Sequence, residues 1–237
     1  MRSYTRHQLK QDSFRTQTTE TISWAVENRS TLTAAVVAVV VVLALLVGGW
    51  AFINYRDQQA RSELAGAIQK YNAPIRPAGT PATPDMLSYG SIQERAKAAN
   101  ADFTHIADKY TFTQSARVAR YFEGVTLHDM GDNAGAEKAL QEVADGRYKQ
   151  IASLAKLALA SIYHDTNRDT QAIAIYKQLA EHPTASADKN TAQFLLASLY
   201  EEDHQTDEAR KLYQQMAKEN PQSAAAQMAA QRLQTLK

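Results

Sequence analysis

The sequence contains no cysteine among its 237 residues. Disulfide bonds, thiolate zinc sites and cysteine nucleophiles are therefore excluded. The absence does not identify a cellular compartment, because proteins of the cell envelope also often lack cysteine.

Recognisable catalytic motifs are absent as well. The chain lacks HExxH, GxGxxG and GxSxG, the phosphate-binding GxxxxGK motif followed by serine or threonine, and an EF-hand loop. We therefore expect a protein that is not an enzyme, with no catalytic residue, no cofactor and no metal ligand.

A strong excess of charge of either sign is also missing. The net charge is +1, but residues 1–84 carry nine basic and five acidic side chains, whereas residues 85–237 carry seventeen and twenty. Phosphate binding needs a basic face, so the mildly acidic distal part argues against nucleic acid as a partner.

What the sequence does contain is one long apolar run, residues 32–53, with no charged side chain. At about 1.5 Å per residue a helix of this length extends roughly 33 Å, enough to cross a hydrocarbon layer about 30 Å thick. The run predicts a transmembrane helix, with the bilayer as its surroundings. A buried core helix is disfavoured because the run is apolar on all sides. A cleaved signal peptide is disfavoured by the long tail before it.

Basic residues favour one orientation of this helix. The tail, residues 1–31, holds Arg2, Arg6, Lys10, Arg15 and Arg29, which favours a cytoplasmic N-terminus, although only two of the five lie in the twenty residues before the span. Charge alone gives a weak orientation signal.

The segment after the span is amphipathic. Within residues 54–71, apolar side chains recur every three to four residues, which predicts that the helix continues as a membrane-proximal stem packed on the distal domain. Residues 72–87 then hold four of the six prolines and predict a linker or surface loop, since proline removes backbone donors.

Residues 88–237 have helical periodicity and an internal repeat. Small residues recur at intervals of 36 or 37, and a large residue follows each of them by four positions. A period in this range predicts stacked helix pairs. The small residues are Ala99, Ala136, Ala172 and Ala209, and the large ones are Phe103, Leu140, Tyr176 and Tyr213.

Three units, residues 118–143, 156–183 and 194–221, resemble tetratricopeptide repeats in their small, aromatic and helix-ending positions. The resemblance implies an all-α fold: a single transmembrane helix followed by an α-solenoid of three to four helix pairs, with residues 223–236 as the C-terminal capping helix. Departures from the motif are the spacing, longer than the usual 34 residues, and the residues Glu123, Asn167 and His204.

The order of parts is similar to the ancillary SecYEG translocon subunit family (YfgM-type), whose repeat domain is shared with the cell-division coordinator CpoB. This resemblance implies a single-pass protein of the plasma (inner) membrane, with a cytoplasmic tail and a periplasmic repeat domain. Its implied partners are the Sec translocon and a membrane-anchored periplasmic chaperone. A divisome or envelope-assembly scaffold is the alternative that the shared repeat domain implies.

In tetratricopeptide proteins the first helix of each pair lines a concave groove that binds peptides. The resemblance implies nine groove-facing residues here, some of which the stem helix could cover. They are Tyr121, Val125, His128, Leu157, Ser161, His164, Phe194, Ser198 and Glu201.

Two of these residues also suggest a different class of function. His128 and His164 occupy the same place in successive repeats, and each precedes an aspartate. Stacking could bring the two imidazoles together, so a metal-dependent sensor or enzyme is the alternative hypothesis. Two polar residues beside inter-helix turns are the simpler interpretation.

Overall fold

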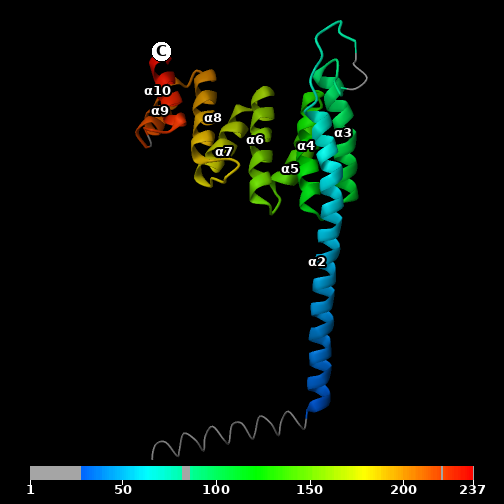
Figure 1. Cartoon of the computed structure of the whole chain (residues 1–237). Helices are drawn as coiled ribbons and strands as arrows, with labels where there is room; N and C mark the ends of the chain where they lie inside the picture. The colour runs from blue at the N-terminus through cyan, green and yellow to red at the C-terminus, as the bar shows by residue number, and fades with distance from the viewer. Residues whose placement is uncertain (1–27, 82–85, 220, 237) are drawn as a thin grey trace, which may run out of the picture. The chain divides into compact units, whose positions relative to one another are not determined.

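The computed structural model describes residues 28–81, 86–219 and 221–236, and within these ranges it contains nine α-helices and no strand longer than a single bridge (Figure 1). Most of the predicted tail, residues 1–31, lies outside the described residues. The helices are α2 (Arg29–Tyr71), α3 (Ile92–Lys109), α4 (Gln114–Asp129), α5 (Asn133–Ala144), α6 (Lys149–Asp165), α7 (Asp169–Glu181), α8 (Lys189–Glu202), α9 (Thr206–Glu219) and α10 (Ala224–Thr235).

The all-α prediction is confirmed. A long apolar N-terminal helix is followed by stacked helix pairs in tetratricopeptide-like packing, and α10 closes the stack by packing on α8 and α9. The chain divides into two units, with the boundary between Asn54 and Tyr55.

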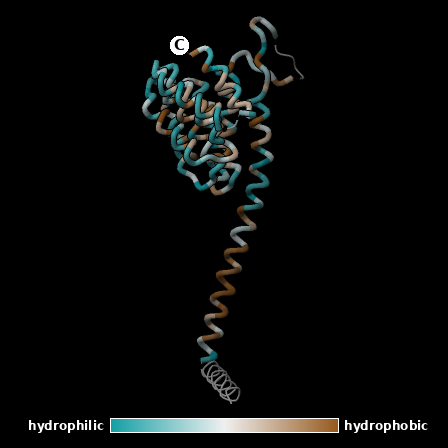
Figure 2. Tube along the Cα trace, turned by 90° about the vertical axis from the view of Figure 1, so that its left-hand side faces the viewer, coloured by the Kyte–Doolittle hydropathy of each residue, from teal (hydrophilic) through white to brown (hydrophobic). Residues whose placement is uncertain are grey.

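Helix α2 has two chemically different halves, which Figure 2 shows as a brown apolar stretch followed by a mixed one. Its apolar stretch is not buried within the protein, which separates it from a core helix. Its length and composition suit either a single-pass membrane anchor or a signal sequence.

The second half of α2 packs as the stem prediction expected. Ala60, Leu64 and Ala67 are buried and share one core cluster with Phe103 of α3 and Ala119 of α4. Their spacing of three to four residues puts them on one face of the helix. Helix α3 therefore has α2 as its partner, and together they form the first helix pair of the stack.

The repeated small residues mark places where helices approach closely. Ala136, Ala172 and Ala209 are fully buried. At Gly124 an added Cβ would lie 2.5 Å from the Cγ atom of Leu140, closer than any real contact allows. The small-then-large repeat in the sequence is thus a packing rule: the large side chain of one helix fills the space left by the small residue of its partner.

The turn inside each helix pair explains two of the departures from the repeat motif. Gly131, Asn167 and His204 follow one another at intervals of 36 and 37 residues, and their φ angles are +86°, +58° and +60°. All three positions require left-handed backbone, which glycine adopts freely and which asparagine and histidine adopt more often than most other residues. The geometry of the turn is retained although the glycine is not.

The described part of the Pro-rich linker forms a loop that is closed at its base. The backbone of Arg76 donates to the carbonyl of Tyr89 at 2.7 Å, and the backbone of Tyr89 donates to the carbonyl of Pro74 at 3.0 Å. These bonds form an isolated bridge between Ile75 and Tyr89. The loop therefore leaves and rejoins the stack at one place, between α2 and α3.

Candidate protein-interaction surface

The nine predicted groove residues lie on three helices, three each on α4, α6 and α8. Ser161 is exposed and the other eight are partly buried. Each of these helices is the first of its pair, the position that faces the concave side in a tetratricopeptide stack.

The large apolar residue on each of these helices also packs inward. Tyr121 contacts the cluster built around Leu140. Leu157 contacts two clusters formed by the third and fourth helix pairs, and the ring of Phe194 lies 5.9 Å from that of Tyr213. Leu157 and Phe194 thus pack against one common core cluster, whereas Tyr121 packs against another. Each helix presents a partly covered apolar side chain rather than a free one.

The three predicted residues of α8 come together around one tyrosine. The Tyr213 hydroxyl donates to Glu201 at 3.2 Å, lies 3.3 Å from the Ser198 hydroxyl, and its ring contacts Phe194. Glu201 also lies 3.7 Å from a guanidinium nitrogen of Arg232 in the capping helix. At this end of the stack the predicted surface is therefore partly occupied by α9 and α10.

His128 and His164 do not share a site. The Nδ1 atom of His128 lies 2.8 Å from Asn133 Oδ1, and the Nδ1 atom of His164 lies 2.6 Å from Asp169 Oδ1. Each imidazole is thus held by the first turn of the next helix. Among the described residues no group of three or more histidine, aspartate or glutamate side chains is arranged to hold a metal ion.

The second nitrogen of each histidine reaches the following repeat. His128 Nε2 lies 3.3 Å from Asp165, and His164 Nε2 lies 2.8 Å from Glu202. The stem makes the equivalent contact, because the Tyr71 hydroxyl donates to Asp129 at 3.0 Å. These three contacts, which we call the polar ladder, link the ends of α2, α4, α6 and α8 in order.

Two donors of the polar ladder, His164 and Tyr71, have a raised pKa. The hydrogen bond to Asp169, together with the one to Glu202, raises the pKa of His164 above its ordinary value of 6.5. Burial, together with the charge of Asp129, raises the pKa of Tyr71 to about 12. These two contacts therefore favour the protonated forms of His164 and Tyr71.

Sequence reasoning identified the histidines but missed their partners in the next repeat. The signal was present: Asp165 follows His128 by 37 residues and Glu202 follows His164 by 38, close to one repeat period. A donor and an acid one period apart are expected to meet when repeats stack in parallel. The Tyr71 contact carries no such signal, because the Pro-rich loop lengthens its spacing to Asp129.

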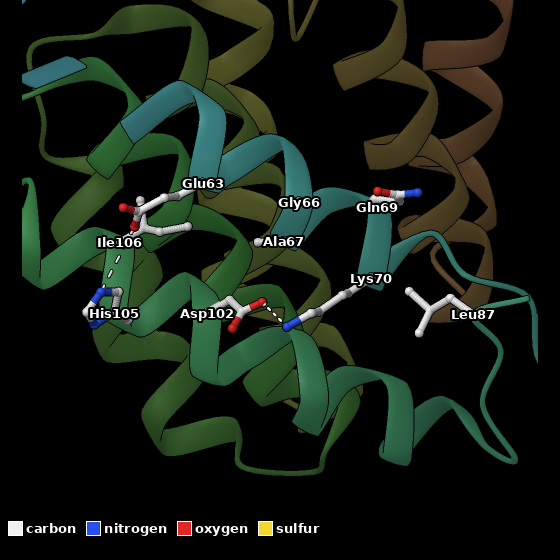
Figure 3. Close-up of a pocket in the computed structure, with 9 residues that line it drawn as sticks. All are labelled: Glu63, Gly66, Ala67, Gln69, Lys70, Leu87, Asp102, His105 and Ile106. Carbon is white, nitrogen blue, oxygen red and sulfur yellow. Dashed lines mark ion pairs between the residues drawn. The ribbon is translucent and has the colours of Figure 1, made fainter. Parts of the chain in front are cut away.

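A second concave feature lies between the stem and α3 (Figure 3). It is a cavity of about 430 Å³ whose apolar wall includes Ala67, Leu87 and Ile106. An ion pair between Lys70 and Asp102, 2.5 Å long, crosses its rim.

The comparisons with known proteins agree with this architecture. No curated protein and no solved structure matches the chain significantly. A sequence family described as a tetratricopeptide repeat-like domain matches residues 23–237, which include both the apolar half of α2 and the whole helical stack. Since that match covers far more than half of the chain, the protein belongs to the tetratricopeptide repeat-like domain family.

Proposed function

We propose that this protein is a membrane-anchored scaffold of the cell envelope that binds partner proteins on the concave side of its helical stack. The finer part of the proposal is an accessory role in Sec-linked protein export or periplasmic chaperoning, with the translocon and a membrane-anchored chaperone as partners. The observation that carries the scaffold role is the stack of helix pairs, because stacked repeats of this kind offer an extended surface to partner proteins.

The composition of that surface supports binding of a polypeptide segment. Along α4, α6 and α8 it alternates partly buried aromatic or aliphatic side chains with small polar ones, such as Ser161 and Ser198. Shallow apolar contacts with nearby hydrogen-bonding groups suit an extended or helical peptide. No motif in the sequence suits the chemical conversion of a substrate, so we assign the protein a binding role.

Anchoring supports this role physically. A protein confined to a membrane meets other membrane-bound partners at a raised effective concentration, so weak contacts are sufficient. In this proposal the apolar half of α2 stays in the plasma membrane, the tail before it is cytoplasmic, and the stack lies on the opposite side.

The cysteine-free sequence allows a direct test in native membranes. A photo-crosslinker attached to a cysteine at Ser161, which is exposed on α6, would probe the predicted groove, and one at Thr170, exposed on the neighbouring α7, is the matched control. We expect adducts with a translocon subunit or a periplasmic chaperone from position 161 and not from position 170. Adducts with divisome proteins would redirect the proposal, and equal adduct patterns at both positions would contradict the groove.

A further inference from the structure

The turn between α3 and α4 carries an aromatic side chain that nothing in the described part of the protein covers. Phe112 is 79% exposed, the highest value for any large apolar side chain in the described residues. Leu45 and Trp50 in the apolar run are 70% and 69% exposed. An exposed phenylalanine in a tight polar turn has no role in the packing of the stack. The contacts of the turn with the rest of the protein indicate the surroundings of Phe112.

The turn is fastened to the residues that directly follow the apolar run. The Arg56 guanidinium donates to the carbonyl of Lys109 and lies 4.7 Å from the centre of the Tyr110 ring. One residue further on, Asp57 accepts a hydrogen bond of 2.9 Å from the backbone of Ser115. The turn therefore has a fixed position relative to the beginning of the stem.

Chain connectivity keeps Arg56, which holds the turn, close to the end of the predicted span. Arg56 follows Ile53 by three residues of continuous helix, a rise of about 4.5 Å. The headgroup layer on each side of a bilayer is roughly 5–8 Å thick. If the run over residues 32–53 spans a membrane, Arg56 lies at headgroup depth and the turn that it holds lies at the lipid surface.

The side chains around Arg56 have the composition of a membrane interface. Tyr55 is 60% exposed and immediately precedes it, and Phe112 lies on the turn that it holds. Aromatic side chains concentrate at the headgroup level because they are apolar with a polar or polarisable edge. The cation of Arg56 complements lipid phosphates, whereas the ammonium of Lys109 is already paired with Glu63 at 2.7 Å.

We propose that Tyr55, Arg56 and Phe112 form a second membrane contact, in which the α3–α4 turn inserts Phe112 among the lipid headgroups beside the span. This inference rests on the proposed membrane anchoring. The span holds the stack to the bilayer at one point, and the turn adds a second point at one side of it. Two points of attachment limit the directions in which the concave surface can face.

Environment-sensitive labels on the full-length protein in phospholipid vesicles test the contact. A cysteine at exposed Thr111 carries the fluorophore beside an intact Phe112, and nitroxide-labelled lipids serve as quenchers. Ala185, exposed in the equivalent turn between α7 and α8, is the matched control, and Leu45 reports on the span. We expect strong quenching at position 45 and quenching at position 111 at least about twofold above that at position 185.

The substitution Phe112→Ser in the Thr111→Cys protein separates insertion from mere proximity. We expect it to remove most of the difference between positions 111 and 185 while leaving position 45 quenched. Equal quenching at 111 and 185, or no effect of Phe112→Ser, overturns the second contact while the anchor stands. Loss of quenching at position 45 overturns the anchor itself. A label at 111 that is shielded from water but not quenched by lipid indicates a protein contact and also overturns the proposal.

Discussion

The two halves of α2 form one continuous helix with opposite relations to the rest of the protein. In residues 32–53 the large apolar side chains are exposed, whereas in the stem Ala60, Leu64 and Ala67 are buried against α3 and α4. The backbone is the same in both halves, so the surroundings that each half requires are set by its side-chain pattern. A helix that is apolar on all sides suits surroundings of lipid, whereas a helix with a single apolar stripe suits packing of that stripe on other helices.

The largest expected difference between the two halves is in how the same substitution, leucine to alanine, changes the free energy of unfolding. Leu64→Ala removes a buried side chain and should lower the free energy of unfolding of the stack by about 2–5 kcal/mol. Leu45→Ala removes an exposed one and should leave that quantity unchanged. Urea denaturation of the full chain in detergent, followed by circular dichroism, measures both. Equal losses would mean that the apolar run also packs on the stack.

A charge placed in each half tests the requirement for lipid. Val40→Arg puts a cation near the middle of the apolar run, where insertion costs about 2.5–3.5 kcal/mol, so less protein should remain in membranes after carbonate extraction. Ser62→Arg, at an exposed stem position, is the control and should behave as the wild type. Full retention of Val40→Arg would argue that the run is not surrounded by lipid.

A third test concerns the polar residue at the junction of the two halves. Asp57 is 7% exposed, and although its burial opposes ionisation, hydrogen bonds from Ser115 and Arg61 hold its pKa below the usual 3.8. Asp57→Ala leaves the buried Ser115 N–H without its partner and should cost about 1–3 kcal/mol in the free energy of unfolding.

The pH dependence of that cost follows from the direction of the shift. Since the pKa is lowered on folding, the contribution of Asp57 is complete above pH 3.8 and is lost as the pH falls through its lower value in the folded state. Denaturation of wild type and variant at neutral and acidic pH measures this. A difference between them that does not shrink in acid would contradict the role of the carboxylate.

The smallest expected effect is on the free energy of unfolding when a contact of the polar ladder is removed, either in α6 or in the stem. His164 has a raised pKa, so its stabilising contribution is present below pH 6.5 and is lost as the pH rises through its higher value in the folded state. The side chain is 36% exposed, so His164→Ala should cost under about 1 kcal/mol.

Tyr71 holds the equivalent place in the stem, but with a pKa of about 12 it stays neutral over the same range. Tyr71→Phe should therefore show no pH dependence between pH 5 and 8, whereas the effect of His164→Ala should decline as the pH rises above 6.5. Thermal unfolding of both variants at several pH values measures the difference. Parallel pH profiles would show that the ladder contact of His164 is not ionic.

The sequence was sufficient for much of the fold because its signals are periodic. The repeat of Ala136 and Leu140 at 36 to 37 residues predicted the helix pairs, and the absence of charge in residues 32–53 predicted the apolar helix. The nine groove residues remain a prediction: the structure places them on α4, α6 and α8, and it shows that Leu157 and Phe194 also pack inward.

Sequence alone determined which segments are helical and that one half of α2 is apolar on all sides while the other has a single apolar stripe, since both depend on side-chain patterns within a few turns. Only the tertiary structure decided that the stem is the first helix of the stack, that Asp57 holds the beginning of α4, and that Arg56 holds the turn bearing Phe112. The last two contacts join residues more than fifty positions apart. They carry no local pattern, because they arise only when separate helices pack side by side.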